Sequence, residues 1–70
     1  MIPLTFADAG TDQIIRKVGG SPEVKKHLED LGFVVGGTVT LISQIGGNLI
    51  VKVKESRIAV SREMAAKIMI

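Results

Sequence analysis

Residues 19–51 read GGSPEVKKHLEDLGFVVGGTVTLISQIGGNLIV, and this stretch decides the fold. It contains, in order, a turn, an amphipathic segment, a second turn, a strand, a hairpin and another strand. Ser21 is a favoured helix-capping residue, and Pro22 fits the first helical position because the N–H missing there has no helical partner anyway. Gly32 can end the helix in a left-handed conformation. The apolar positions repeat at i, i+4 and i+7, which predicts a helix with one apolar face formed by Val24, Leu28 and Leu31.

The polar face of this predicted helix carries two pairs of opposite charges, each four residues apart. Lys25 is paired with Glu29, and Lys26 with Asp30. Both pairs have the cation first, which is the weaker order for such pairs.

An alternating segment and a glycine hairpin follow. Residues 38–41 alternate polar and apolar side chains, which places Val39 and Leu41 toward the interior. Gly46 and Gly47 permit the positive φ angles of a tight turn between this strand and the next. The return strand has three apolar residues on one face: Leu49, Val51 and Val53.

Shorter elements complete the chain on its C-terminal side. Glu55 and Ser56 are predicted to form a second turn, before a strand over 57–60 whose inward residues are Ile58 and Val60. Ser61 can cap a helical turn over 62–66. Residues 68–70 are expected to pair as a strand, because a free apolar terminus would fray.

The first 18 residues have weaker patterns. Leu4 and Phe6 share one side if the backbone there is extended. Residues 13–18 form a predicted strand in which Arg16 and Lys17 interrupt the alternation. A bulge, or a strand half exposed on both faces, would explain this interruption.

Length and composition favour one small domain over residues 1–70. One helix ahead of a meander of strands indicates a mainly β fold with short helices, namely a small β-barrel with one helical crossover and a short C-terminal helical turn. Apolar residues and the 8 glycines together exceed half of the 70 residues, above the usual figure of about 45–50%. We therefore expect exposed apolar surface that an oligomer or a docking partner would cover, although small barrels also need many valines and isoleucines in their cores.

Charge and hydropathy exclude several classes of protein. The net charge of +2, from nine basic and seven acidic residues, is too balanced to indicate nucleic-acid binding. No stretch approaches the ~18 apolar residues of a membrane span, so no membrane insertion is expected. The first residues lack the basic segment and apolar core of a signal peptide, and the expected location is the cytoplasm.

The order of apolar and glycine residues resembles the ferrous iron transport protein A (FeoA) family along nearly the whole chain. The matching positions are Leu4, Gly10, Ile15, Val18, Gly19, Leu28, Leu31, Gly32, Phe33, Gly36, Val39, Gly46, Gly47, Ala59, Val60, Ala65 and residues 68–70. Two positions depart from the family pattern: His27, where arginine is common, and Val35, where proline often stands before the glycine. The resemblance implies an SH3-like barrel that works in the cytoplasm beside a membrane ferrous-iron transporter with a GTP-binding domain. It also implies kinship with the terminal domain of some metal-dependent repressors.

Metal binding and catalysis find little support among the residues. Ferrous iron prefers several converging imidazole and carboxylate ligands, and His27 is the only histidine. His27 could pair with Glu23, and Asp8 with Asp12, but a surface histidine and turn chemistry explain these residues more simply. No serine has a recognisable base beside it, and the hairpin lacks the Lys-Ser/Thr of a phosphate loop. We expect no catalytic, cofactor-binding or metal-binding residues and no enzymatic activity.

A nucleic-acid surface is a second binding class. Lys52 and Lys54 share a strand face that Arg16 and Lys17 could extend. Barrels that bind single strands usually add aromatic stacking platforms, whereas this chain has only two phenylalanines. We therefore expect no nucleic acid as partner.

Protein docking agrees best with the residues. The three apolar residues at 33–35 lie between two glycine groups, so not all of them can face the core, and the hairpin tip carries an apolar residue where a polar one would be expected. The candidate partner-binding residues are Phe33, Val35, Ile45, Gly46 and Gly47. Apolar anchors of this kind carry most of the binding energy at interfaces, although Phe33 and Ile45 could instead fill the core.

The sequence thus predicts a small cytoplasmic accessory or regulatory protein of ferrous iron uptake, which binds the cytoplasmic GTP-binding region of the transporter. The step from barrel to protein binder rests on the residues, and the step to iron rests on the resemblance alone. Three alternatives stay open: a module that binds transition metal ions or accompanies a repressor, a small barrel that binds nucleic acid, and a homo-oligomer formed through exposed apolar surface or an open strand edge.

Overall fold

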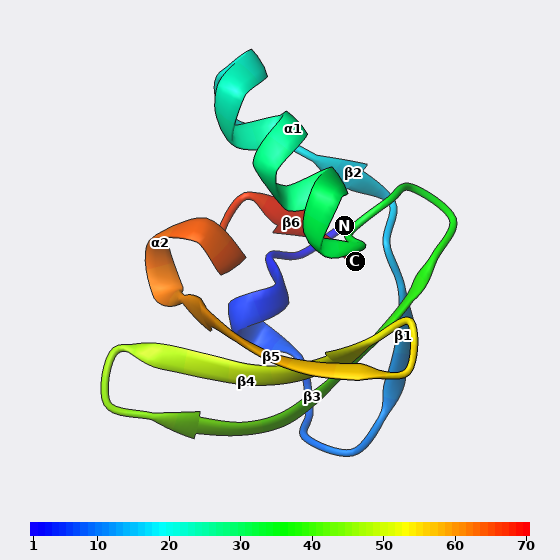
Figure 1. Cartoon of the computed structure of the whole chain (residues 1–70). Helices are drawn as coiled ribbons and strands as arrows, with labels where there is room; N and C mark the ends of the chain where they lie inside the picture. Colours follow the sequence, from blue (N-terminus) through cyan, green and yellow to red (C-terminus); the bar gives the residue numbers. More distant parts are fainter.

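Two antiparallel sheets form the barrel in the computed structural model, which describes all residues from 1 to 70. The larger sheet has four strands in the order β1-β3-β4-β5, and the smaller sheet pairs β2 with β6. The elements follow the chain as η1 (Leu4–Phe6), β1 (Asp12–Ile14), β2 (Lys17–Val18), α1 (Pro22–Leu31), β3 (Thr38–Ile45), β4 (Asn48–Val53), β5 (Ser56–Ser61), α2 (Arg62–Ala65) and β6 (Ile68–Met69). In Figure 1, β3, β4 and β5 lie at the bottom, α1 stands at the top, and the small sheet and α2 lie between them.

The inward faces of β3 and β4 form the centre of the core. Val39 pairs with Val53 and Leu41 pairs with Val51 across the two strands, and all four are at most 2% exposed. Because successive side chains of a strand point to opposite faces, this register confirms the predicted inward positions. The core comprises 14 buried residues: Leu4, Ile15, Val18, Leu28, Phe33, Val39, Leu41, Leu49, Val51, Val53, Val60, Ala65, Ile68 and Ile70.

The helix α1 begins and ends where the sequence predicts. The Ser21 Oγ accepts a hydrogen bond of 3.2 Å from the Val24 N–H, and Pro22 is the first helical residue. Gly32 closes the helix with φ +112°. The predicted apolar face is only partly buried, because Leu28 is fully covered while Leu31 remains 37% exposed. Neither helix of the structure has the length and apolar composition needed to cross a membrane.

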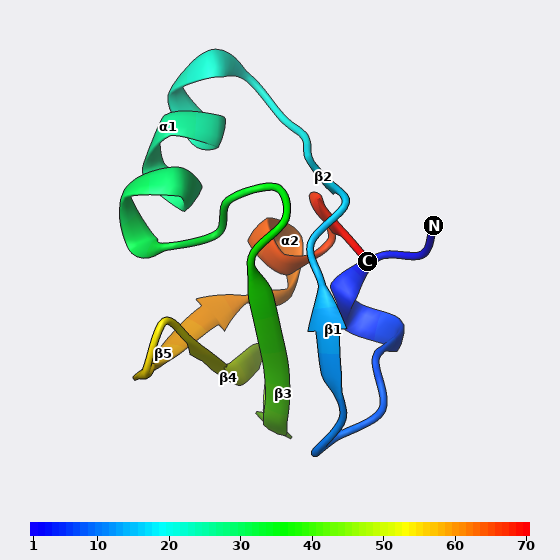
Figure 2. The same ribbon diagram turned by 90° about the vertical axis from the view of Figure 1, so that its right-hand side faces the viewer.

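The single strand predicted over 13–18 is wrong, because the chain changes sheets within it. β1 pairs with β3, and β2 pairs with β6. At the crossing, the Ile15 N–H donates to the Gly37 carbonyl, and the Arg16 N–H donates to the Met69 carbonyl, both at 2.8 Å. Ile15 is fully buried between the two sheets. The interrupted alternation therefore marks a transfer between sheets, and Figure 2 shows the chain rising from β1 into β2 beside β3.

The extended start predicted for Leu4 and Phe6 is also wrong. These residues form a short 3-10 turn, in which the Phe6 N–H donates to the Pro3 carbonyl at 3.0 Å. With about three residues per turn, positions two apart point in different directions. Leu4 consequently enters the core, whereas Phe6 is 71% exposed.

The second turn lies one residue earlier than the sequence indicates. Lys54 and Glu55 occupy it with φ values of 50° and 66°, and Ser56 is already the first residue of β5. Paired positive φ values are typical of the tight hairpin turns that match strand twist. Along β5, Val60 is buried and Ile58 is half-buried, which agrees with their predicted inward positions.

The C-terminal elements close the barrel as expected. The Ser61 Oγ accepts a hydrogen bond of 3.2 Å from the Met64 N–H and so caps α2. β6 pairs with β2. The Ile70 N–H donates to the Ile2 carbonyl at 2.8 Å, and the Ile2 N–H donates to the Ile70 carbonyl at 3.0 Å. The apolar end of the chain is therefore paired, as predicted.

Candidate functional site

The two exposed apolar side chains of the predicted docking set lie near opposite ends of β3 (Thr38–Ile45). Val35 is 67% exposed in the turn before the strand, and Ile45 is 65% exposed at the hairpin that ends it. The strand has 8 residues, and seven steps of about 3.3 Å separate its two ends by roughly 23 Å. Figures 1 and 2 agree, because the 33–37 turn and the 45–48 hairpin lie on opposite sides of the molecule. The predicted residues therefore do not form one continuous surface.

Phe33 does not belong to any exposed surface, so its prediction as a partner-binding residue is corrected. Its side chain is fully buried. The Phe33 N–H donates to the Leu28 carbonyl at 3.0 Å, and the Gly32 N–H donates to the Glu29 carbonyl at 2.9 Å. This is the Schellman helix end, in which the residue after the glycine contacts an apolar residue of the last turn. The Leu28–Gly32–Phe33 spacing was the sequence signal for this burial.

The hairpin around Gly46 and Gly47 is exposed but convex. A side chain at either glycine would meet no atom within 4 Å. The Arg62 N–H donates to the Gly47 carbonyl at 2.9 Å, and the Arg62 Nη2 donates to the Gln44 Oε1 at 3.1 Å. These bonds tie the hairpin to the start of α2. None of the three surface hollows of the structure is lined by hairpin residues.

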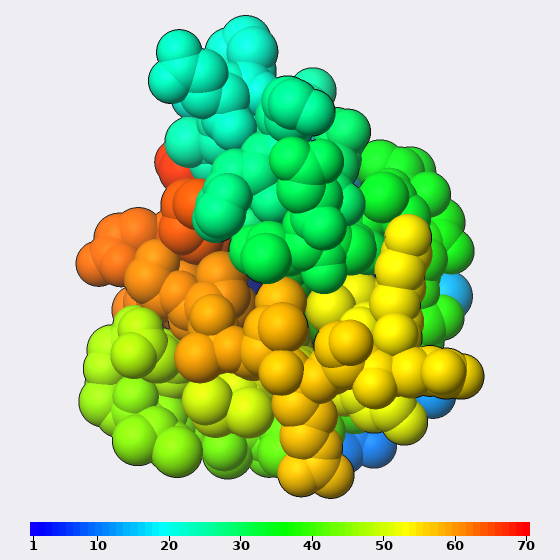
Figure 3. Space-filling model, in the orientation of Figure 1, coloured from blue at the N-terminus to red at the C-terminus, as the bar shows by residue number.

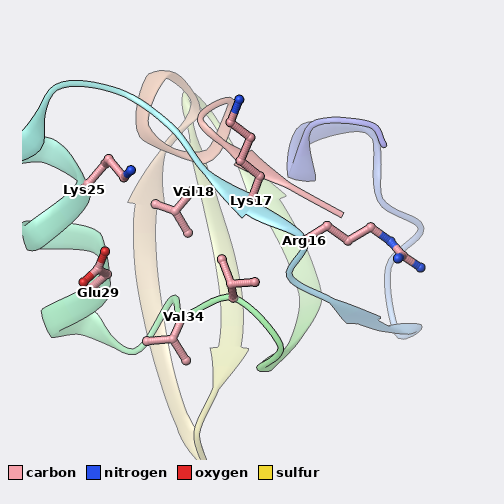
Figure 4. Close-up of a pocket in the computed structure, with 7 residues that line it drawn as sticks. Arg16, Lys17, Val18, Lys25, Glu29 and Val34 are labelled. Carbon is pink, nitrogen blue, oxygen red and sulfur yellow. The ribbon is translucent and has the colours of Figure 1, made fainter.

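One hollow combines an apolar floor with a charged rim, and we call it the α1 groove. It has a volume of about 390 Å³ and lies between α1, β2 and the 33–37 turn. Its floor is formed by Val18, Val34 and Val35, and its rim by Arg16, Lys17, Lys25 and Glu29. In Figure 4, Lys25 and Glu29 project from α1 toward Val18 and Val34, whereas Arg16 and Lys17 lie on the β2 side and their charged ends point away from these valines. Figure 3 shows α1 as a ridge that stands above the barrel.

None of the charged residues around the α1 groove takes part in an ion pair. The one ion pair of the structure joins the Lys26 Nζ to the Asp30 Oδ1 at 3.7 Å. The predicted pair of Lys25 with Glu29 does not form within that distance, although both line the groove. Arg16 and Lys17 have no carboxylate partner either. The rim therefore holds three cations and one carboxylate.

Sequence reasoning missed the α1 groove because its walls come from three separate segments. Arg16 and Lys17 were considered only as an extension of a basic strand face, and Lys25 only as half of an ion pair. One signal was present: Lys25 directly follows Val24, which is half-buried, and precedes the buried Leu28 by three residues. A residue at such a position borders the apolar stripe of its helix.

A second hollow of about 220 Å³ is wholly polar and lies on the outer face of the large sheet. Its lining residues are Asp12, Thr38, Thr40, Lys52, Lys54 and Glu55. The Thr40 Oγ1 donates a hydrogen bond to the Asp12 Oδ1. Two carboxylates balance the two lysines, and no aromatic side chain borders them, so this face has neither the charge nor the stacking surface of a single-strand binder.

Metal ligands do not converge in the structure. No group of three His, Asp or Glu side chains is placed to hold a metal ion. His27 is exposed on α1. The Asp12 carboxylate is engaged by the Thr40 hydroxyl.

The match to a family model decides which family this barrel represents. The FeoA domain model covers residues 2–70. The chain belongs to the FeoA domain family. A protein of Methanocaldococcus jannaschii, provisionally named Fe(2+) transport protein A, is 33% identical over 70 residues, which cover 100% of this chain and 85% of the relative.

Solved FeoA structures share the fold. The crystal structure of an iron uptake regulatory protein, FeoA, has a TM-score of 0.88 at 25% identity, covering 97% of this chain and 92% of the other. The zinc complex of Stenotrophomonas maltophilia FeoA has a TM-score of 0.84 at 23% identity, covering 99% and 88%. That protein is described as a prokaryotic SH3 domain protein and a candidate activating factor for bacterial ferrous iron transport. The expected SH3-like barrel is thereby confirmed for this FeoA chain.

Proposed function

We propose that this FeoA protein is a cytoplasmic accessory protein of ferrous iron uptake that acts by binding the cytoplasmic GTP-binding region of a ferrous iron transporter. The observation that carries this proposal is the match of the FeoA domain model to residues 2–70. The names of the relatives, which refer to Fe(2+) transport and to iron uptake regulation, support the same role.

Binding rather than catalysis accounts for the surface chemistry. Ser21 and Ser61 use their hydroxyl oxygens to cap α1 and α2. His27 is exposed on the helix, and none of the side-chain hydrogen bonds joins it to a serine hydroxyl that it could activate. In contrast, Val35 and Ile45 expose more than 60% of their surface. Apolar side chains exposed to this extent are suited to burial in an interface.

A titration tests the proposal. The purified chain is added to the purified cytoplasmic GTP-binding region of the transporter, with and without ferrous iron and with GDP or a GTP analogue, and binding is followed by calorimetry. Saturable binding is expected in at least one of these states. The absence of binding in every state, with the chain folded by circular dichroism, would refute the proposed function and leave the fold unaffected.

A further inference from the structure

We propose that the α1 groove binds a segment of a partner protein in which one apolar side chain is flanked by carboxylates. This inference rests on the proposed function as a protein binder, and it names the surface and the chemistry of the segment. Val35 and Ile45 have nearly equal exposure, but only Val35 lies in a hollow. The α1 groove is therefore the surface that the geometry favours.

The shape of the α1 groove suits one apolar anchor. Val18 is buried beneath the groove, Val34 is half-buried, and Val35 is 67% exposed beside them. An apolar side chain placed there would contact three valines and remove Val35 from water. Anchors that fill a pocket in this way carry most of the energy of many interfaces. The volume of about 390 Å³ falls within the usual range for binding pockets, roughly 300–1,000 Å³.

The rim of the α1 groove selects the charge of the segment. Lys25 stands on the helix side of the floor, and Arg16 and Lys17 stand on the β2 side. None of these cations has a carboxylate within 4.0 Å, whereas Lys26 is already paired with Asp30. Carboxylates on both sides of the apolar anchor would complement these cations, while a basic segment would be repelled.

The walls of the α1 groove are held in place before any partner binds. The Gly36 N–H donates to the Ile15 carbonyl at 2.8 Å, and the Gly37 N–H donates to the Val34 carbonyl at 2.9 Å. The first bond fixes the 33–37 turn to the crossing between the two sheets. The helix wall is capped at both ends, by Ser21 and by Gly32. A preformed groove avoids much of the ordering cost of association.

Two pairs of matched variants test whether the α1 groove is the binding surface. The Kd of each variant for the proposed transporter region is measured at 0.15 M NaCl. Lys25→Glu is compared with Lys26→Glu, because the two lysines are adjacent and the two variants have equal net charge. At this salt concentration the screening length is about 8 Å, so only charges close to the bound segment should affect Kd. We expect Lys25→Glu to raise Kd about three- to tenfold, and Lys26→Glu by less than about twofold.

The second pair compares Val35→Asp with Ile45→Asp, which remove the same kind of exposed β-branched residue from opposite ends of β3. Val35→Asp should raise Kd by more than about tenfold, because a carboxylate would replace the apolar floor. Ile45→Asp should change it by less than about twofold. Both should unfold at the temperature of the parent chain. If Ile45→Asp lost binding and Val35→Asp retained it, the proposed role of the α1 groove would be overturned. The binding surface would then lie at the hairpin.

A peptide experiment separates failure of the α1 groove from failure of the proposed function. The probes are the blocked peptides Glu-Glu-Leu-Glu-Glu and Lys-Lys-Leu-Lys-Lys, added at millimolar concentration to the isotope-labelled chain. The acidic peptide should shift the amide signals of Val18, Val34 and Val35, and the basic peptide should not. No shift with the acidic peptide, or equal shifts with both, would overturn the proposal. Acidic-peptide binding without transporter binding would support the groove and refute the proposed function.

Discussion

The side chain of Lys54 lies across Gly32. The Lys54 Cδ and Cγ are 3.5 and 3.6 Å from the position that a Gly32 Cβ would occupy, and a Val53 methyl group is also 3.6 Å away. The β4–β5 turn thereby covers the C-terminal end of α1, as Figure 3 shows where the yellow turn meets the green end of the helix. Long lysine stems often cover surface in this way while their charged ends stay in water.

Gly32→Ala should destabilise the protein by about 1–2 kcal/mol, because φ +112° is unfavourable for any residue with a Cβ. The contacts with Lys54 and Val53 are at ordinary distances, so the backbone conformation is the main cause. Urea unfolding measures the loss. Gly47→Ala is the matched control, because Gly47 lacks a positive φ and its Cβ would enter open space. Equal stability of the two variants would contradict the left-handed end of α1.

Glu55→Gly should stabilise the protein by about 0.5–1 kcal/mol. Glu55 has φ 66° in the β4–β5 turn, a conformation that costs less for glycine than for glutamate. Tight hairpin turns with two positive φ values favour glycine at the second position. Thermal unfolding provides the measurement, with Ser56→Gly as the control, which should destabilise because Ser56 is a strand residue. A lower melting temperature for Glu55→Gly would place the turn elsewhere.

Leu28→Ala should lower the free energy of unfolding by about 2–5 kcal/mol. Because so small a domain has little stability to lose, a large fraction of the molecules should be unfolded at room temperature. Leu28 is fully buried and also contributes the carbonyl that accepts the Phe33 N–H. Leu31→Ala removes the same side chain three residues later, where 37% of it is exposed, and should cost less than half as much. Circular dichroism during chemical unfolding compares them. A stable Leu28→Ala variant would mean that the helix does not face the core as described.

The elements that the sequence predicted well are those with local signals. Ser21, Pro22 and Gly32 mark the ends of α1 through their own backbone and capping chemistry, and the alternation of Val39 with Leu41 sets the face of β3. The elements predicted wrongly depend on distant partners. β1 ends before Ile15, where Gly36 and Gly37 bond to the Ile15 backbone and the C-terminal strand bonds to Arg16. No local pattern describes such a transfer between sheets.

The candidate site could be predicted only in fragments. Val35 is a candidate partner-binding residue because not all of residues 33–35 can face the core, and its side chain is 67% exposed. Phe33 was misplaced, because the helix-end motif buries the residue after Gly32. The cations of the α1 groove come from β2 and α1, and their proximity depends on how the helix stands on the barrel. That placement is a tertiary property and leaves no repeat in the sequence.

Gly20 lies next to the N-terminal end of α1. We expect Gly20→Ala to lower the free energy of unfolding more than Gly32→Ala does at the C-terminal end. Gly20 has φ +97°, and its Cβ would lie 3.0 Å from the Val24 Cγ1 and 2.8 Å from the Lys67 Cδ. The lysine can move aside, but Val24 belongs to the first turn of α1, so the helix itself must shift. We expect a loss of more than about 2 kcal/mol in urea unfolding, from backbone strain and crowding together.

Gly19→Ala is the control for this variant, because Gly19 lacks a positive φ and its Cβ would only approach the Lys67 carbonyl at 3.4 Å. It should cost less than about 1 kcal/mol. Since α1 forms one wall of the α1 groove, Gly20→Ala should also weaken binding of the acidic peptide under conditions where the variant is still folded, whereas Gly19→Ala should not. If Gly20→Ala lost stability but bound the peptide normally, the position of α1 would not control the groove.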